Sequence, residues 1–234
     1  GFPAYLPSRL AAFYERAGCV QSLSGAAGSV SIIGAVSPQG SDFSEPVTQN
    51  TKRFVRCFLA LDKSLAYARH YPAINWTMSY SEYYEDLDPY YTEHLGEKFC
   101  TMRGRILGLL SEENKLMEIV KLIGEDVLPD DQKLVLEAAR IIRVGLLQQN
   151  AYHAIDTYVP LDKQLRMMEL MLKLYHGAKD IVSRAIPLSQ LKETGIFESL
   201  AKMKYEVPND GQEKFAEYDA AIEDALRQVN EANR

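Results

Sequence analysis

Histidine and cysteine are the residue types most able to bind metals or act as nucleophiles, and this chain contains few of them. Its cysteines lie far apart, at Cys19, Cys57 and Cys100. This spacing contains neither a disulfide framework nor a CxxC pair. Its histidines are His70, His94, His153 and His176. No HxxxH spacing occurs among them, so we expect small buried thiols and surface histidines rather than a metal site.

Two acidic residues follow histidines at helical spacing, Glu97 after His94 and Asp156 after His153. Neither pair has a third candidate ligand nearby, whereas a zinc ion in a protein normally has at least three protein ligands. No local pattern favours a catalytic Cys–His pair either. We therefore expect no metal ligands in this chain.

The common phosphate-binding and hydrolytic motifs are absent from the sequence. GxxxxGK[ST], GxGxxG, GxSxG and HExxH do not occur, and no glycine is followed directly by lysine. Residue patterns alone therefore leave the activity open.

Tyrosines and carboxylates crowd the segment from residue 80 to residue 91. The tyrosines are Tyr80, Tyr83, Tyr84, Tyr90 and Tyr91, and they alternate with Glu82, Glu85, Asp86 and Asp88. Such rings could stack on bases or sugars. The acidic surroundings favour the alternative, a linker that acts as a hinge packed by amphipathic rings between two domains.

The elements that must position these residues change in kind along the chain. Residues 29–36 form a short apolar run between Gly28 and a Ser-Pro-Gln-Gly turn signal, which predicts a buried strand. We favour a second strand over residues 54–59. Strands that alternate with helices predict a parallel α/β sheet, and so few strands predict only part of such a domain.

The helices of this first part have recognisable start signals. Residues 8–17 predict a helix with Ser8 as its N-cap. Pro46 suits the first turn of a second helix, because the N–H that proline lacks needs no partner there. A third helix is predicted from Asp62 to His70, capped by Asp62.

From Trp76 onward the pattern is entirely helical. Apolar residues recur at helical spacing over 99–123, 134–144, 165–174 and 215–229. Gly124 predicts the end of the first of these helices. The last stripe, Phe215, Tyr218, Ile222, Leu226 and Val229, predicts an amphipathic terminal helix. We expect an all-α bundle.

Composition and charge exclude several function classes. The chain has 234 residues, 47% of them hydrophobic, and a net charge of −6. An acidic chain without a basic tract is a poor match to nucleic-acid binding. No apolar run reaches the roughly 18 residues of a membrane span, and the amino terminus lacks the signal-peptide pattern. We expect a soluble, cytosolic protein.

Charge also divides the chain. Residues 1–75 hold 7 Lys/Arg and 4 Asp/Glu, a net of +3, whereas the remainder holds 19 and 28, a net of −9. We therefore expect two domains, an α/β part over residues 1–75 and a helical domain over residues 76–234.

Four long stretches of the sequence resemble the catalytic A subunit of archaeal-type and vacuolar-type (A/V-type) rotary ATPases. They are FPAYLPSRLAAFYERAG, GSVSIIGAVSPQGSDFSEPVTQ, YPAINWTMSYSEYY and LLQQNAYHAIDTY, which begin at Phe2, Gly28, Tyr71 and Leu146. The resemblance implies the carboxyl-terminal part of that subunit, beyond its phosphate-binding loop and catalytic glutamate. The implied fold is an α/β remnant of a P-loop-type nucleotide-binding domain with a parallel sheet, followed by an all-α helical bundle.

The resemblance implies one half of an adenine pocket at Tyr71 and Pro72, where an aromatic ring in a YPA turn of the related F-type subunit stacks on the base. An aromatic beside proline also has little entropy to lose, which suits a stacking platform. The second wall implied by the resemblance is Gln149, Asn150, Ala151 and Tyr152. The small Ala151 would let the ring approach, and the two amides could hydrogen-bond its edge. For Tyr152, plain helix packing remains the alternative.

The resemblance also implies a contact with a rotating central stalk, through an acidic turn between two helices. The carboxylates of this turn are Glu125, Asp126, Asp130 and Asp131. The turn departs from the F-type pattern, because Val127-Leu128-Pro129 stands at its centre and glutamates are fewer. The alternative is a solvated acidic turn in which Pro129 and Asp130 start the next helix.

The whole subunit would then synthesise or hydrolyse ATP, with Mg²⁺, and couple this to proton or sodium transport. Its implied partners are B subunits in an alternating hexameric ring, central-stalk rotor subunits and peripheral-stalk subunits. The implied location is cytoplasmic, at the cell membrane only through the complex. This chain would lack catalytic residues, bind no nucleotide of its own and be inactive alone. The alternative is a non-enzymatic helical interaction module.

Overall fold

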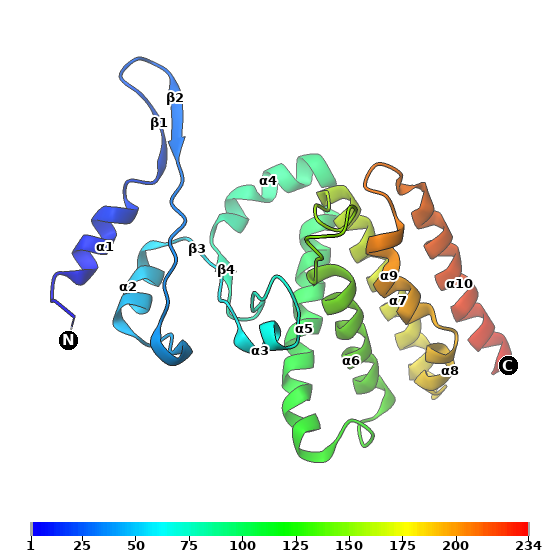
Figure 1. The fold of residues 1–234 in the computed structure, drawn as a ribbon. Helices are drawn as coiled ribbons and strands as arrows, with labels where there is room; N and C mark the ends of the chain where they lie inside the picture. The colour runs from blue at the N-terminus through cyan, green and yellow to red at the C-terminus, as the bar shows by residue number, and fades with distance from the viewer. Residues whose placement is uncertain (1, 234) are drawn as a thin grey trace. The chain divides into compact units, whose positions relative to one another are not determined.

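The computed structural model describes residues 2–233, and the chain divides into two compact units (Figure 1). The first unit runs to Ala60 and also contains Met78–Glu85. The second comprises Leu61–Thr77 and the chain from Asp86 onward. These units differ from the expected division at residue 75, because Leu61–Thr77 groups with the helices that follow it.

Short helices and two-stranded sheets make up the first unit. Its elements are α1 (Leu6–Tyr14), β1 (Gly18–Gln21), β2 (Ala27–Val30), the 3₁₀ turn η1 (Gln39–Ser41), α2 (Pro46–Phe54), β3 (Cys57–Phe58) and β4 (Tyr80–Ser81). β1 pairs with β2 and β3 pairs with β4, both antiparallel. Gly18 lies opposite Val30, and Cys57 lies opposite Ser81.

The strands of the described residues do not form the expected parallel sheet. β2 ends at Val30, and residues 31–38 contain no regular element. All residues of β1 and β2 are exposed, and Ile33 is 100% exposed. An apolar run becomes a buried strand only where neighbouring strands and helices cover it. Here β1 is the strand that pairs with the start of the run within the described residues, through a turn at Gly25, whose φ is +84°, and Gly34 lies against the side chain of Tyr14 of α1.

The helix starts of the first unit are partly as predicted. α1 begins at Leu6 rather than after Ser8, whose hydroxyl donates to the carbonyl of Tyr5. α2 begins at Pro46 as predicted. Because α2 continues through Phe54, the predicted strand over residues 54–59 is reduced to β3.

Helices dominate the second unit. They are α3 (Lys63–Tyr67), α4 (Tyr83–Leu95, which begins in the first unit), α5 (Lys98–Ile123), α6 (Asp130–Ile142), the π-helical turn η2 (Arg143–Leu147), α7 (Leu161–Ser183), α8 (Leu188–Glu193), α9 (Ile196–Glu206), the 3₁₀ turn η3 (Gln212–Lys214) and α10 (Phe215–Ala232). Asp62 caps α3 as predicted, by accepting from the backbone N–H groups of Ser64 and Leu65. The expected all-α bundle is confirmed.

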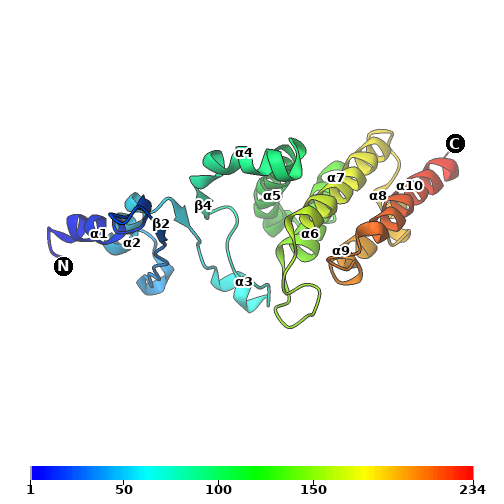
Figure 2. The same cartoon turned by 90° about the horizontal axis from the view of Figure 1, so that it is seen from above.

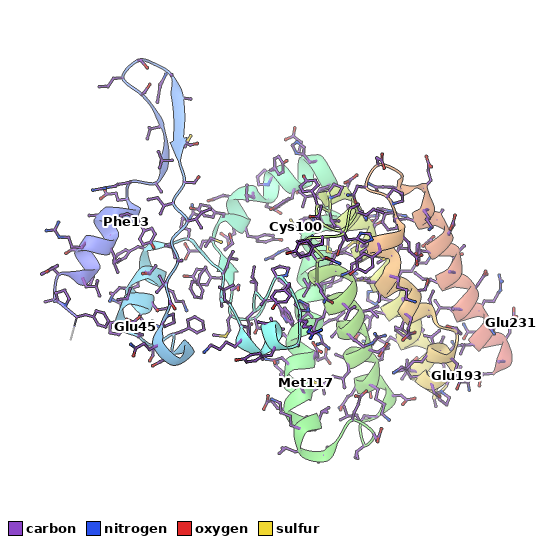
Figure 3. All side chains as sticks on the ribbon, in the orientation of Figure 1. Phe13, Glu45, Cys100, Met117, Glu193 and Glu231 are labelled. Atoms are coloured by element: carbon purple, nitrogen blue, oxygen red, sulfur yellow. The ribbon has the colours of Figure 1, made fainter. Side chains whose placement is uncertain are left out.

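The core of the second unit lies between α5, α6, α7, α9 and α10 (Figures 1 and 2). Side chains fill the space between these helices (Figure 3). Leu174 of α7, Phe197 and Met203 of α9 and Ile222 of α10 are fully buried. The apolar stripes predicted for α5, α6, α7 and α10 therefore lie in the core, together with α9, for which no stripe was predicted.

The tyrosine-rich segment is mainly helical, and it connects the two units, which divide between Glu85 and Asp86. It forms most of α4, with Pro89 inside the helix. Within the second unit, Tyr91 packs against Phe99 with ring centroids 4.9 Å apart. Among the helices of residues 2–233, none combines the length and the hydropathy of a bilayer-spanning segment.

Candidate functional site

The two segments expected to contact a base meet inside the second unit. The backbone N–H of Gln149 donates to the carbonyl of Tyr71 over 2.8 Å. The side-chain amide of Gln148 donates to the carbonyl of Arg69 over 3.2 Å. Segments almost 80 residues apart in sequence are therefore joined backbone to backbone, as a shared site requires.

Tyr71 is held by its backbone and by its hydroxyl, which donates to the carbonyl of Ala66 over 3.4 Å. The residue is nevertheless 54% exposed, and Pro72 beside it is exposed too. The turn around Tyr71 is closed by a bridge between Leu61 and Ile74 and by the bond from the N–H of Asp62 to the carbonyl of Ala73. A turn that is fixed by hydrogen bonds and that exposes an aromatic ring is a suitable platform for stacking.

The loop over residues 148–158, here called the base loop, presents Tyr152. This side chain is 99% exposed and lies outside any helix. Helix packing, the alternative considered for Tyr152, is therefore wrong. A fully exposed ring has no packing role within the described chain, whereas a flat ligand could use it for stacking.

The other residues of the predicted wall shape the loop itself. The side-chain oxygen of Asn150 accepts from the N–H of Tyr152 over 3.0 Å. The carbonyl of Ala151 accepts from the hydroxyl of Thr157 over 2.9 Å. Asn150 thus uses its amide oxygen in the loop, and Gln149 is the half-buried residue that touches the Tyr71 turn.

The π-helical turn η2 connects α6 to the base loop. π turns are rare, and they are frequent at functional sites. Within this turn, a Cβ on Gly145 would lie 2.8 Å from Cε of Met171 and 3.1 Å from Cα of Ala201. Glycine is therefore required for the close approach of α9.

Buried charges lie beneath the base loop, and sequence reasoning missed them. Lys204 and Asp156 are each 1% exposed, and Lys204 Nζ lies 3.7 Å from Asp156 Oδ2. The same Asp156 oxygen accepts from the N–H of Asn150 over 2.6 Å, and Lys204 donates to the carbonyl of Gln148. Burial lowers the pKa of Lys204, and the negative charge of Asp156 opposes this shift.

His70 is buried between these groups and the Tyr71 turn. Its ring packs against Trp76 with centroids 5.5 Å apart. Burial lowers the pKa of His70, and the positive charges of Arg143 and Lys204 lower it further. Arg143 itself pairs with the buried Glu113 over 2.9 Å.

Two of the sequence-based expectations about histidines and cysteines are wrong. His70 was expected at the surface but is buried. Cys19 and Cys57 were expected to be buried but are exposed.

The acidic turn lies at the other end of α6 from the base loop, between α5 and α6 (Figure 1). Gly124 ends α5 as predicted. Glu125, Asp126 and Asp131 are exposed. Asp130 is half-buried, and its carboxylate accepts from the backbone N–H of Leu188 over 2.8 Å. Asp130 therefore also holds the start of α8.

The same end of the α5–α6 hairpin exposes apolar side chains. Leu122 is 85% exposed, and Ile123 and Val127 are also exposed, whereas Leu128 is buried. Met117, labelled in Figure 3, is exposed on α5 toward this end. A partner at this turn would meet both carboxylates and apolar groups.

Two family profiles match the sequence. Residues 1–81 match the "ATP synthase alpha/beta family, nucleotide-binding domain". Residues 88–192 match the "C-terminal domain of V and A type ATP synthase". The two matches follow one another along the chain, in the order of an α/β part and a helical part.

Curated relatives carry names of the same kind. V-type ATP synthase alpha chain 2 of Clostridium tetani is 60% identical over 90% of this chain and 36% of its own length. The V-type ATP synthase alpha chain of Halothermothrix orenii is 54% identical over 96% and 38%. The A subunit of the A-type ATP synthase of Methanopyrus kandleri is 44% identical over 99% and 39%. The chain thus spans less than two-fifths of the length of these relatives.

A solved structure shares the fold. The ATP synthase subunit NeqB from Nanoarcheaum equitans aligns with a TM-score of 0.62 at 22% identity. The alignment covers 74% of this chain and 42% of that one.

Proposed function

The chain belongs to the family of V- and A-type ATP synthase A subunits, and we propose that it is the carboxyl-terminal part of a catalytic A subunit. In that protein, Tyr71 and the base loop would form the two walls of an adenine pocket. The observation that carries this proposal is the 2.8 Å bond from Gln149 N–H to the Tyr71 carbonyl, because it fixes the two walls relative to each other.

Each wall would contribute a different interaction. The rings of Tyr71 and Tyr152 would stack on the faces of the base, each worth about 1–3 kcal/mol. The side-chain amide of Gln149 would hydrogen-bond the base edge, which presents both donors and acceptors. Pro72 would stiffen the Tyr71 turn, and Ala151 would leave room for the ring.

The phosphates and Mg²⁺ would be held elsewhere in the whole protein. These 234 residues contain no GxxxxGK[ST] motif. Within residues 2–233, no three His, Cys, Asp or Glu side chains gather as metal ligands would. The residues present fit the base alone, and when ATP binds, the phosphoryl chemistry would come from the phosphate loop and Mg²⁺. We therefore propose that this chain by itself hydrolyses no ATP.

The acidic turn would contact the central stalk, through Glu125, Asp126 and Asp131 with Val127 beside them. The whole protein would lie at the cytoplasmic side of the membrane. Its partners would be the B subunits of an alternating ring, the rotor and the peripheral stalk. The part of the first unit up to Ala60 would join the parallel sheet of the nucleotide-binding domain, and the helices from residue 86 onward would form the helical domain. Membership of a larger sheet would account for the exposed apolar residues of β2 and of the segment after it, because neighbouring strands would cover them.

An ATP analogue with a photoreactive azide on the adenine tests this proposal in the full-length protein. We expect the label at Tyr71 and Tyr152 themselves, located by fragment-ion sequencing of the labelled peptides. Tyr67 and Tyr158 are exposed tyrosines in the same segments and serve as internal controls. Label confined to Tyr67, Tyr158 or other surfaces would contradict the pocket and favour a non-enzymatic interaction module.

A further inference from the structure

The base loop has little apolar burial of its own. Ala151, Tyr152, Thr157 and Tyr158 are all exposed. Segments with few buried apolar contacts open at low cost in free energy. The conformation of this loop must therefore depend on its polar anchors.

One buried cation holds the first half of the loop. Lys204 donates to the carbonyl of Gln148 and pairs with Asp156, whose same oxygen accepts from the N–H of Asn150. The residues on both sides of Gln149 are thereby fixed. This sets the position of the Gln149 N–H, which donates to Tyr71 without touching either charged side chain.

A second buried lysine holds the other half to the same end of α9. Lys163, which is fully buried, donates to the carbonyls of Lys204 and Val207 and to the side-chain oxygen of Asn209, over 3.0, 2.6 and 3.0 Å. The amide nitrogen of Asn209 in turn donates to the carbonyls of Ile155 and Tyr158, over 3.0 and 2.7 Å. Both halves of the loop are therefore attached to the carboxyl-terminal end of α9.

We propose that Lys204 is a positioning residue, which fixes the base loop to α9 and so sets the distance between the Tyr71 wall and the Tyr152 wall. This inference rests on the proposed adenine pocket for its functional consequence. The structural part of the proposal is that Lys204 keeps the base loop ordered, and this part depends only on the contacts of Lys204. A loop attached in this way follows any movement of α9 and α7.

Two variants separate positioning from stability. Lys204→Met removes the cation and leaves Asp156 buried without its partner, so we expect a clear loss of global stability. Asp156→Asn combined with Lys204→Met removes both charges, and the asparagine can still accept from Asn150. We expect this double variant to recover part of the stability, because Asp156 no longer remains buried as an unpaired carboxylate, although the buried Lys163 loses the negative charge of Asp156 and keeps only its neutral acceptors. Lys173→Met is the matched control, since Lys173 pairs with Asp219 and Glu223 away from the loop.

The readout is amide hydrogen exchange of Gln149 in this chain, together with urea unfolding. We expect exchange of Gln149 in the double variant to be about tenfold faster than in the parent, equivalent to about 1.4 kcal/mol of lost hydrogen bonding. Lys173→Met should leave this exchange unchanged. Parental exchange of Gln149 in the double variant would overturn the proposal, because Lys204 would then contribute to stability only.

A second arm uses the full-length protein to compare the binding of ATP and GTP. We expect the double variant to lose about tenfold in its preference for ATP, because the amide of Gln149 no longer faces the base edge in a fixed position. Faster exchange with an unchanged preference would support positioning but contradict the adenine pocket itself. Failure of the positioning role and failure of the adenine pocket therefore give different results.

Discussion

At the scale of single residues, His70 is the group whose protonation the fold opposes. It is buried, its Nε2 makes no hydrogen bond within the described chain, and Arg143 and Lys204 supply positive charge. Each of these factors disfavours the imidazolium ion. The folded chain therefore holds the neutral ring.

This predicts a pH dependence of stability with a definite sign. The pKa of His70 is lower in the folded chain than its ordinary value of 6.5. The unfolded chain then binds more protons, so the free energy of unfolding should fall as the pH drops from about 7.5 to about 5.5, by at most about 1.4 kcal/mol per pH unit. Urea unfolding at both pH values measures it.

His70→Asn supplies the control for this titration. The variant should be less dependent on pH than the parent over the same interval, whatever its absolute stability. His176→Asn is the matched variant at an exposed histidine. An equal pH dependence in His70→Asn and the parent would show that other groups are responsible.

Some residues of the site were predictable and others were not. Tyr71 and residues 149–152 were identified through their resemblance to a family, and the structure brings their segments together. Lys163, Lys204 and Asp156 were not identified as anchors, because lysines and carboxylates are normally exposed and only tertiary packing reveals a buried one. Asp130 was grouped with exposed carboxylates, since its bond to Leu188 joins residues 58 apart.

At the scale of elements, the π turn between α6 and the base loop depends on Gly145. We expect Gly145→Ala to reduce the free energy of unfolding by about 1–3 kcal/mol, because its methyl group would press on the backbone of Ala201 and on Met171. Urea unfolding measures this loss.

Gly108→Ala is the matched control in an open position. Gly108 lies in α5, and a Cβ there would meet nothing within 4 Å. Alanine should therefore raise stability by up to about 1 kcal/mol through its helix propensity. Equal effects at the two glycines would contradict close packing at Gly145.

The elements were predictable where the signal is local. Helix stripes carry their own periodicity, so α5, α6, α7 and α10 agree with the predicted segments. The end of α5 at Gly124 and the cap at Asp62 are also local signals. The strand predicted over residues 29–36 failed because strand pairing depends on partners that its own residues do not specify.

At the scale of the whole molecule, α6 connects the two proposed contacts. The acidic turn precedes α6, and the π turn η2 connects α6 to the base loop, so a helix of 13 residues, about 20 Å long, and this turn separate the two contacts. The core side of α6, including Leu134, Ala139 and Ile142, is fully buried. A packed helix moves as a rigid body, which would let nucleotide-driven movement of the loop reach the turn.

The turn predicts charge-dependent binding of the stalk in the assembled complex. Replacing Glu125, Asp126 and Asp131 together by their amides should weaken stalk binding, most strongly at low ionic strength where the lost attraction was greatest. Folding should change little, since exposed substitutions normally cost within about 0.5 kcal/mol. Titration of the stalk onto the ring at several salt concentrations measures this.

Val127→Ala distinguishes an apolar contact at the same turn. If the carboxylates carry the interaction, this variant leaves the salt dependence unchanged. The electrostatic account is contradicted if the triple amide variant binds the stalk with parental affinity and parental salt dependence while Val127→Ala loses affinity. The contact would then be made by apolar groups.

The measurement that tests the central claim most directly is nucleotide affinity of the full-length protein with changes at Tyr71. Tyr71→Ala should weaken ATP binding by about 1–3 kcal/mol, the range for stacking of a base on an aromatic ring. Tyr71→Phe should be nearly neutral, because the ring is retained, and Tyr67→Ala, at an exposed tyrosine of α3, should have no effect. Parental affinity in Tyr71→Ala, or equal losses in Tyr71→Ala and Tyr71→Phe, would contradict a stacking role for this residue.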